Sequence, residues 1–433
     1  MAGARFLSRA RFIVLIAATV ALTWWAVPGS ASGPETPAPT PTRAGLTRDM
    51  AELLADRQPT QRLAPMAFTP CIDGHAGQYP CKNVDLDAFL PLSGIGGGAG
   101  SDLNGWTDPA TGKEYAIMGR SNGTAFVDIG DPVHPLYLGN LPTGTISTAW
   151  REIGVFRNYA FIVCDACGAH GMQIFDLTEL RDIPVPPVTF SETAHYSGFN
   201  TAHTITIDAR TGFAYANGSE TCGGGPHMVD IRDPLNPTFA GCNSGDGYTH
   251  DSQCVVYRGP DVEHRGQEIC FNSNEDTLTI VDVTDKSNPT QISRTSYPGV
   301  GYTHQGWLTP DHRFFVLDDE LDEVFFSHNT WTRFFDIRNL EAPVVRFVFK
   351  SATAAIDHNQ FVKGSFVYQA NYRAGLRILR LPRPAEVAFF DIYPADDAPD
   401  FNAAWGNYPF FASGTVIVSG IEQGLFVLHP NLP

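Results

Sequence analysis

Four histidines occupy equivalent positions in successive segments of the chain, each at the start of a short apolar stretch. The aligned histidines are His203, His250, His304 and His358. Trp150 and Trp405 fill the same position in two other segments, and Asn104 fills it in the first. Because the chain has only 13 histidines, four in one column are not expected from composition alone. Neutral imidazoles that meet from separate segments are suitable ligands for a divalent transition metal.

Three interpretations of this column remain open. In the first, each imidazole donates a hydrogen bond to the backbone of a neighbouring segment and recurs because the segment was duplicated. In the second, the imidazoles bind a metal or a small ligand, and carboxylates orient their outer nitrogens. In the third, they act as general acids and bases on a substrate. Trp150 and Trp405 then either stack on a sugar ring or a quaternary ammonium, or pack in the interior.

Polar residues in the turn after the second strand of each segment are expected beside the histidines. The residues predicted to bind a ligand at this place are Trp150, Arg151, Glu275, Asp318, Asp319 and Trp405. The acidic run over residues 318–323 also offers the oxygen donors that Ca²⁺ prefers, but it lacks the spacing and the glycine of an EF-hand. We therefore expect a solvated acidic loop, and we favour a transition metal over calcium as the cofactor.

A repeated strand is the element that must position these residues. Five copies end in aspartate and two degenerate copies follow; the copies begin at Ala125, Gln173, His227, Thr279, Arg333, Arg377 and Leu425. Each aspartate precedes a turn and is expected to cap its backbone donors. A period of roughly fifty residues built from strands is typical of a β-propeller blade. The fold is thus predicted to be all-β, a single β-propeller of seven four-stranded blades whose first strands line a central channel.

The ring must also be closed. The last unit stops after its third strand, whereas residues 84–92 alternate apolar and polar side chains ahead of the first complete unit. We predict that this N-terminal segment supplies the missing outer strand, because closure hides sheet edges that are otherwise exposed. The alternative is an extension that packs elsewhere. The propeller is predicted to span residues 71–433.

The cysteines fall into pairs that are close in sequence, and their even number fits complete oxidation. The predicted disulfides are Cys71–Cys81, Cys164–Cys167, Cys222–Cys242 and Cys254–Cys270. No helical pattern follows Cys164-Asp-Ala-Cys167, so a local structural bridge is favoured over a redox motif, and the cysteine spacings do not fit a zinc site. A bridge across the first hairpin of the fourth unit places His250 opposite Asn274, next to Glu275.

The N-terminus indicates export. Arg5, Arg9 and Arg11 precede an apolar stretch over residues 12–27, after which Pro28 and small residues follow. Residues 1–31 are therefore predicted to be a signal peptide, with an uncleaved anchor as the alternative. Residues 32–70 are predicted to be a Pro/Thr-rich linker with a short helix over 46–63. The formal charge of −17 argues against nucleic acid as a partner, and no transmembrane domain is expected after cleavage.

Several longer stretches resemble the choice-of-anchor B family, whose repeat is called LVIVD. They include GYTHDSQCVVYRGPD (247–261), EICFNSNEDTLTIVDVTDKSNP (268–289) and GYTHQGWLTPDHRFFVLDDELDE (301–323). The resemblance covers most of residues 80–430 and implies an exported β-propeller held at the cell surface by a C-terminal sorting device, with no established reaction. This chain ends at Pro433 without a hydrophobic tail, so free secretion is expected instead.

The sequence thus predicts a secreted or cell-surface binding module. Its partner is an extracellular protein, a glycan or a small ligand, and a metal or small ligand at the channel mouth is part of this hypothesis. The alternative is a metal-dependent extracellular enzyme of the hydrolase type that uses the same histidines with nearby carboxylates.

Overall fold

A computed structural model describes residues 63–432. The predicted signal peptide over 1–31, the linker up to residue 62 and nearly all of the helix predicted over 46–63 lie outside the described residues. In the described part, no helix is both long and apolar enough to cross a membrane.

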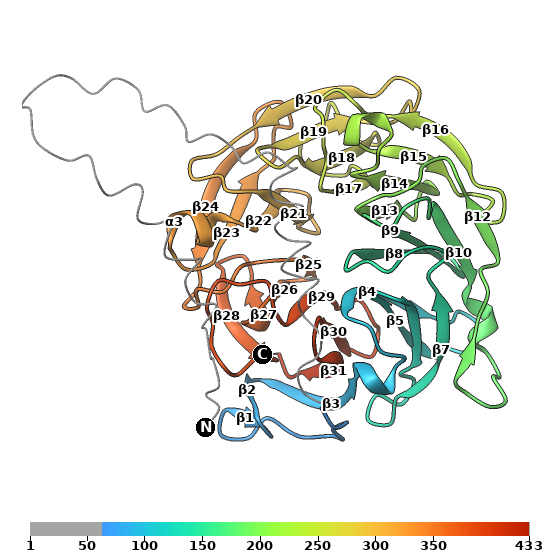
Figure 1. Cartoon of the computed structure of the whole chain (residues 1–433). Helices are drawn as coiled ribbons and strands as arrows, with labels where there is room; N and C mark the ends of the chain where they lie inside the picture. Colours follow the sequence, from blue (N-terminus) through green and yellow to red (C-terminus); the bar gives the residue numbers. More distant parts are fainter. Residues whose placement is uncertain (1–62, 433) are drawn as a thin grey trace, which may run out of the picture. The chain divides into compact units, whose positions relative to one another are not determined.

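Seven antiparallel sheets form a ring (Figure 1). Blade 1 contains β4 (Gly100–Thr107), β5 (Glu114–Arg120), β6 (Gly123–Asp128) and β7 (Leu136–Pro142). Blade 2 contains β8 (Arg151–Phe156), β9 (Tyr159–Cys164), β10 (Met172–Asp176) and β12 (Ala194–Tyr196). Blade 3 contains β13 (Thr204–Asp208), β14 (Phe213–Asn217), β15 (His227–Asp230) and β16 (Thr238–Cys242).

The second half of the ring follows the same plan. Blade 4 contains β17 (Asp251–Val256), β18 (Glu268–Ser273), β19 (Leu278–Asp282) and β20 (Thr290–Thr295). Blade 5 contains β21 (Thr303–Leu308), β22 (Phe314–Asp319), β23 (Trp331–Asp336) and β24 (Val344–Lys350), with the short helix α3 (Asp322–Phe326) between β22 and β23. Blade 6 contains β25 (Gln360–Lys363), β26 (Phe366–Asn371), β27 (Gly375–Arg380) and β28 (Ala385–Phe390).

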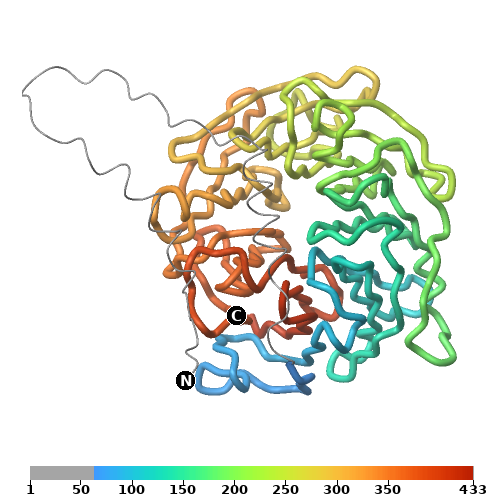
Figure 2. The backbone as a smooth tube through the Cα atoms, in the orientation of Figure 1, coloured from blue at the N-terminus to red at the C-terminus, as the bar shows by residue number. Residues whose placement is uncertain are grey.

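Blade 7 confirms the predicted closure. Its strands are β29 (Ala404–Tyr408), β30 (Val416–Gly420), β31 (Gly424–Pro430) and β3 (Val84–Pro91). β3 pairs antiparallel with β31 along its whole length, so the blue N-terminal segment lies beside the dark red C-terminal one (Figure 2). Phe89 of β3 packs on Phe426 of β31 with ring centroids 4.5 Å apart. The N-terminal strand therefore completes a sheet begun by the C-terminus.

The apolar character of the repeated strands follows from their position. Each blade stacks between two others, so its second and third strands are covered on both faces; every residue of β5 and five of six in β9 are buried. The first strands of neighbouring blades contact each other all the way round, from β4 to β29 and back to β4. These strands line the channel, and residues at their starts meet around one axis.

The repeated aspartates are structural, as predicted. Each accepts a hydrogen bond at Oδ1 from the backbone N–H two residues later, over 2.8 to 3.2 Å; the five are Asp128, Asp176, Asp230, Asp282 and Asp336. This contact fixes the turn into the outer strand.

All four predicted disulfides are present: Cys71–Cys81, Cys164–Cys167, Cys222–Cys242 and Cys254–Cys270. Cys254 and Cys270 are directly opposite in β17 and β18, and their Cα atoms lie 4.0 Å apart. The predicted register holds from Asp251, which lies opposite Ser273, to Val256, which lies opposite Glu268. Just before β17, His250 N–H donates to the Ser273 carbonyl, so the pairing predicted between His250 and Asn274 is not continued at this position.

Candidate functional site

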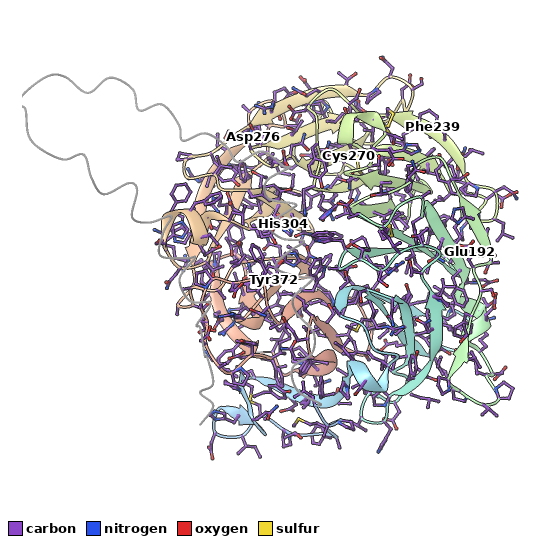
Figure 3. All side chains as sticks on the ribbon, in the orientation of Figure 1. Glu192, Phe239, Cys270, Asp276, His304 and Tyr372 are labelled. Carbon is purple, nitrogen blue, oxygen red and sulfur yellow. A yellow bond between two sulfur atoms is a disulfide. The ribbon has the colours of Figure 1, made fainter. Side chains whose placement is uncertain are left out.

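The aligned histidines form one continuous row, which we call the histidine row. Ring centroids are 4.4 Å apart between His203 and His250, 4.2 Å between His250 and His304, and 4.5 Å between His304 and His358. The labelled His304 lies at the inner side of the ring (Figure 3). Residues 54 or 47 positions apart thus become neighbours because each starts the first strand of its own blade.

Tryptophans border the row at both ends. Trp150 lies 6.4 Å from His203 and Trp405 lies 5.2 Å from His358, measured between ring centroids. Both indoles are buried in an apolar cluster with Leu321, Tyr372 and Phe401. They are packing residues here, and their faces are not presented to a sugar or to a quaternary ammonium.

Hydrogen bonds at Nδ1 fix the orientation of all four imidazoles. His250 Nδ1 donates to the His304 carbonyl oxygen over 2.9 Å, and His358 Nδ1 donates to the Trp405 carbonyl oxygen. Because a carbonyl only accepts, these Nδ1 atoms carry the proton and Nε2 keeps its lone pair. His203 Nδ1 instead faces Asp165 over 3.0 Å, and His304 Nδ1 faces Asp318 over 3.2 Å. Such outer contacts are the ones that orient metal-bound histidines.

Three groups converge on the inner side. Glu320 has Oε2 at 3.9 Å from His304 Nε2 and Oε1 at 3.8 Å from His358 Nε2. Their ligand atoms all lie within 4.8 Å of one another. Two ligands about 2.1 Å from a tetrahedral metal lie roughly 3.4 Å apart, so a small inward movement suffices to bind one ion. Tyr372 O–H donates to Glu320 Oε1 over 2.7 Å and holds the carboxylate in place.

The electrostatics of the row concentrate positive charge on one ring. Burial disfavours the charged form of His304, but Glu320 and Asp318 outweigh burial and raise its pKa to about 9. Burial and the nearby charge of His304 hold the pKa values of His250 and His358 well below the ordinary value. His250 and His358 are therefore neutral at pH 7, the form in which histidine binds metals.

The other predicted ligand-binding residues turn away from this point. Arg151 donates to the Arg120 carbonyl and contacts His170 between blades 1 and 2. Asp319 accepts from Tyr297 O–H and from the Gly301 and Tyr302 N–H groups, which ties down the segment before β21.

Two further positions also differ from the expected pattern. Glu275 accepts at its carbonyl from Thr303 N–H, a backbone contact that holds the start of β21. Asn104 is not in the row, because it lies opposite Ile117 well along β4, whereas His304 directly follows the first residue of β21. Its side-chain amide donates to the Ile153 carbonyl instead.

Sequence reasoning also missed a set of channel carboxylates. A cavity of about 430 Å³ is lined by Asp102, Glu152 and Asp251 among residues of the first strands. Burial raises the pKa of Asp102 to about 8 and that of Asp251 to about 6. Burial and the charge of Asp102 also raise the pKa of Glu152 well above its ordinary value. Two acidic residues close to the aligned column could have revealed this set. Asp251 directly follows His250, and Glu152 lies two residues after Trp150.

One solved structure supports the fold. The β-propeller domain of Cps50 (Swd1) from Myceliophteria thermophila aligns with a TM-score of 0.50 and 13% identity, over 78% of this chain and 98% of that one. A functionally unknown protein from Desulfotomaculum acetoxidans aligns with a TM-score of 0.49 and 11% identity, over 77% of this chain and all of the other. No protein-family model matches the chain, and no curated protein does. The chain is a seven-bladed β-propeller, a fold that serves many functions.

Proposed function

We propose that this protein is an extracellular binding module of the LVIVD-repeat type that holds a divalent transition metal at His304, His358 and Glu320. The carrying observation is the convergence of two Nε2 atoms and one carboxylate at the inner edge of blades 5 and 6. His250 and His203 extend the row and are the candidates for a further ligand. Burial of the row favours a small ion over a glycan as its occupant, because His304 is only 1% exposed.

Export is part of this proposal. Four disulfides in one domain fit an oxidising compartment. A signal peptide over residues 1–31 supplies the route. The binding partner is then an extracellular protein or small ligand that contacts the rim of the propeller, as ring-shaped β-sheet scaffolds commonly present their loops.

Elemental analysis of the purified full chain tests the metal. We expect about one zinc, copper, nickel or iron ion per chain after equilibrium dialysis. The double variant His304→Gln, His358→Gln is expected to retain less than a tenth of that ion. His134→Gln, which alters an exposed histidine paired with Asp131, serves as the control and should retain it. If the native protein contains no metal after dialysis, the histidine row has only a structural role.

A metal-dependent hydrolase is the second candidate. The carboxylates of Asp102, Glu152 and Asp251 favour it, because they line a cavity and the charge of Asp251 acts on His304. The metal-loaded protein should then hydrolyse a nitrophenyl ester or phosphate, and Asp251→Asn should abolish turnover without loss of metal. If turnover is equal in the native protein and in Asp251→Asn, the enzymatic proposal fails and the binding module stands.

A further inference from the structure

A second cluster lies at α3, and it differs from the solvated loop expected from the sequence. Asp322 and Glu323 are 0% and 1% exposed, and Asp318, Asp319 and Glu320 are equally buried. The helix interrupts blade 5 between β22 and β23 (Figure 1). The solvated-loop prediction is wrong because the chain turns inward after β22 and carries these carboxylates into the body of the blade. We call Asp322, Glu323 and Asp357 the acidic pocket.

The oxygens of the acidic pocket lack donors. Both oxygens of Glu323, both oxygens of Asp357 and Oδ1 of Asp322 are buried without a hydrogen-bond partner. Asp357 is 0% exposed, and the charges that act on it most are those of Glu323 and Asp318. A buried carboxylate with neither a hydrogen bond nor a counter-ion is strongly unfavourable, so these groups must either take up protons or bind a cation.

Existing cations balance only part of the charge. Arg333 pairs with Asp322 at Oδ2, which leaves Oδ1 available. His328 Nε2 is 3.8 Å from Asp322 Oδ2, and its ring stacks on Trp331 with centroids 3.9 Å apart. The ligand atoms of Asp322, Glu323 and His328 lie within 4.8 Å of one another. One guanidinium thus pairs with Asp322 and is also acted on by the charge of Asp319.

Protons are the competing explanation, and they account for less. Burial and the Asp322 carboxylate raise the pKa of Glu323 to about 10, so Glu323 can share a proton with Asp322. Burial and the charge of Glu323 also raise the pKa of Asp357 well above its ordinary value, but a proton on each acid still leaves one oxygen of each group without a donor. A cation that reaches Glu323, Asp322 Oδ1 and Asp357 satisfies all of these oxygens together.

We propose that Asp322, Glu323 and Asp357 bind a calcium ion. Five free carboxylate oxygens suit the coordination of Ca²⁺, which takes about 6–8 oxygen ligands in flexible geometry. Mg²⁺ fits less well, because it keeps several waters and these oxygens are shielded from solvent. The acidic pocket is distinct from the cluster of His304, Glu320 and His358, although Glu320 lies two residues before Asp322 and His358 directly follows Asp357.

Calorimetric titration of the chelator-treated full chain with Ca²⁺ tests this site. We expect one ion per chain with a Kd of about 10⁻⁶ to 10⁻³ M. Saturating Ca²⁺ should raise the Tm by about 3–6 °C. Glu323→Gln and Asp357→Asn should each weaken binding at least tenfold. Glu341→Gln is the matched control, since Glu341 belongs to an exposed cluster with Asp261 and His264, and it should bind Ca²⁺ like the native chain.

Each other outcome overturns the proposal. If titration of the native protein with Ca²⁺ gives neither a heat signal nor a change in Tm, the acidic pocket holds protons and not an ion. Binding that survives in both variants, or a preference for Zn²⁺ over Ca²⁺, places the ion elsewhere or changes its class. If the variants do not fold, Tb³⁺ luminescence of the native chain replaces them: Ca²⁺ should displace it, and Trp331→Phe should reduce it by at least half. Emission unchanged in Trp331→Phe contradicts the site.

The two metal proposals fail separately. The His304→Gln, His358→Gln variant should still bind Ca²⁺, whereas Glu323→Gln should still bind the transition metal. A protein that binds neither ion refutes both, and a protein that binds one refutes only the other.

Discussion

The histidine row and the acidic pocket meet in the segments around β22 and before β25, yet they satisfy their polar groups differently. In the row, Nδ1 of each imidazole has an acceptor and Glu320 has the Tyr372 hydroxyl as a donor. In the acidic pocket, five carboxylate oxygens have no donor. The row can therefore stand empty with one proton on His304, whereas the acidic pocket needs added positive charge. An unoccupied row is a stable scaffold, whereas an acidic pocket without an ion must hold protons, because burial and mutual repulsion raise the pKa values of Glu323 and Asp357.

The largest effect is expected from Arg333→Met, which removes the guanidinium that faces the acidic pocket. Breaking a buried ion pair from one side leaves an uncompensated charge, so we expect a loss of about 3–5 kcal/mol in the free energy of unfolding. Urea unfolding measures it. Arg338→Met is the control, because that side chain is 59% exposed and solvent screens its pair with Asp336, so little change in stability is expected. Equal effects of the two variants would mean that the acidic pocket is uncharged.

A smaller effect is expected from Tyr372→Phe, which tests the histidine row and its carboxylate Glu320. It removes the hydroxyl that donates to Glu320 Oε1. Outer contacts of this kind affect metal affinity by about 10–100-fold, and competition with a chromogenic chelator measures that change. Tyr297→Phe removes a matched hydroxyl that donates to Asp319 over 2.7 Å and should leave the affinity unchanged. An unchanged affinity in Tyr372→Phe would show that Glu320 needs no support.

The smallest effect concerns an ordinary buried histidine outside both clusters. Burial lowers the pKa of His227 to about 4, while Tyr196 and Thr221 contact its two ring nitrogens. The unfolded chain takes up a proton near pH 6.5 and the folded chain does not, so stability is lost as pH falls from about 6.5 to 4. His227→Gln should make the fall in Tm between pH 7 and pH 4.5 smaller. An identical fall in both proteins would contradict the neutral ring.

The fold could be predicted from the sequence because each sequence repeat corresponds to one blade of the propeller. The repeated strands, the turn aspartates and the cysteine pairs each follow from local spacing, and β3 was identified as the strand that the last unit lacked. The aligned histidines met for the same reason, since equivalent positions in a ring face a common axis. Their role as metal ligands stays a prediction.

The remaining features depend on geometry that spacing does not carry. Asn104 lies opposite Ile117, farther along β4 than the sequence alignment placed it, and the register shifts in the first strands β4, β21 and β29 are not marked by any residue type. In the run 318–323, successive carboxylates point to His304, to the segment before β21, to the channel and into the acidic pocket. The direction of each carboxylate depends on the turn after β22 and on α3, which residue spacing does not reveal. The charge of Glu323 in blade 5 acts on Asp357 just before blade 6, an interaction that no local pattern predicts.

The pairing of β3 with β31 has a consequence for the order of events during synthesis. Pro91 pairs with Gly424, so the two strands leave the ribosome roughly 300 residues apart, or about 20–60 s at common translation rates. Until the later strand arrives, the earlier one has no edge to join, and the seventh sheet stays incomplete. Closure of the propeller is therefore a late, long-range step. A chaperone that covers Leu86 and Phe89 until β31 has been synthesised would protect the chain before closure.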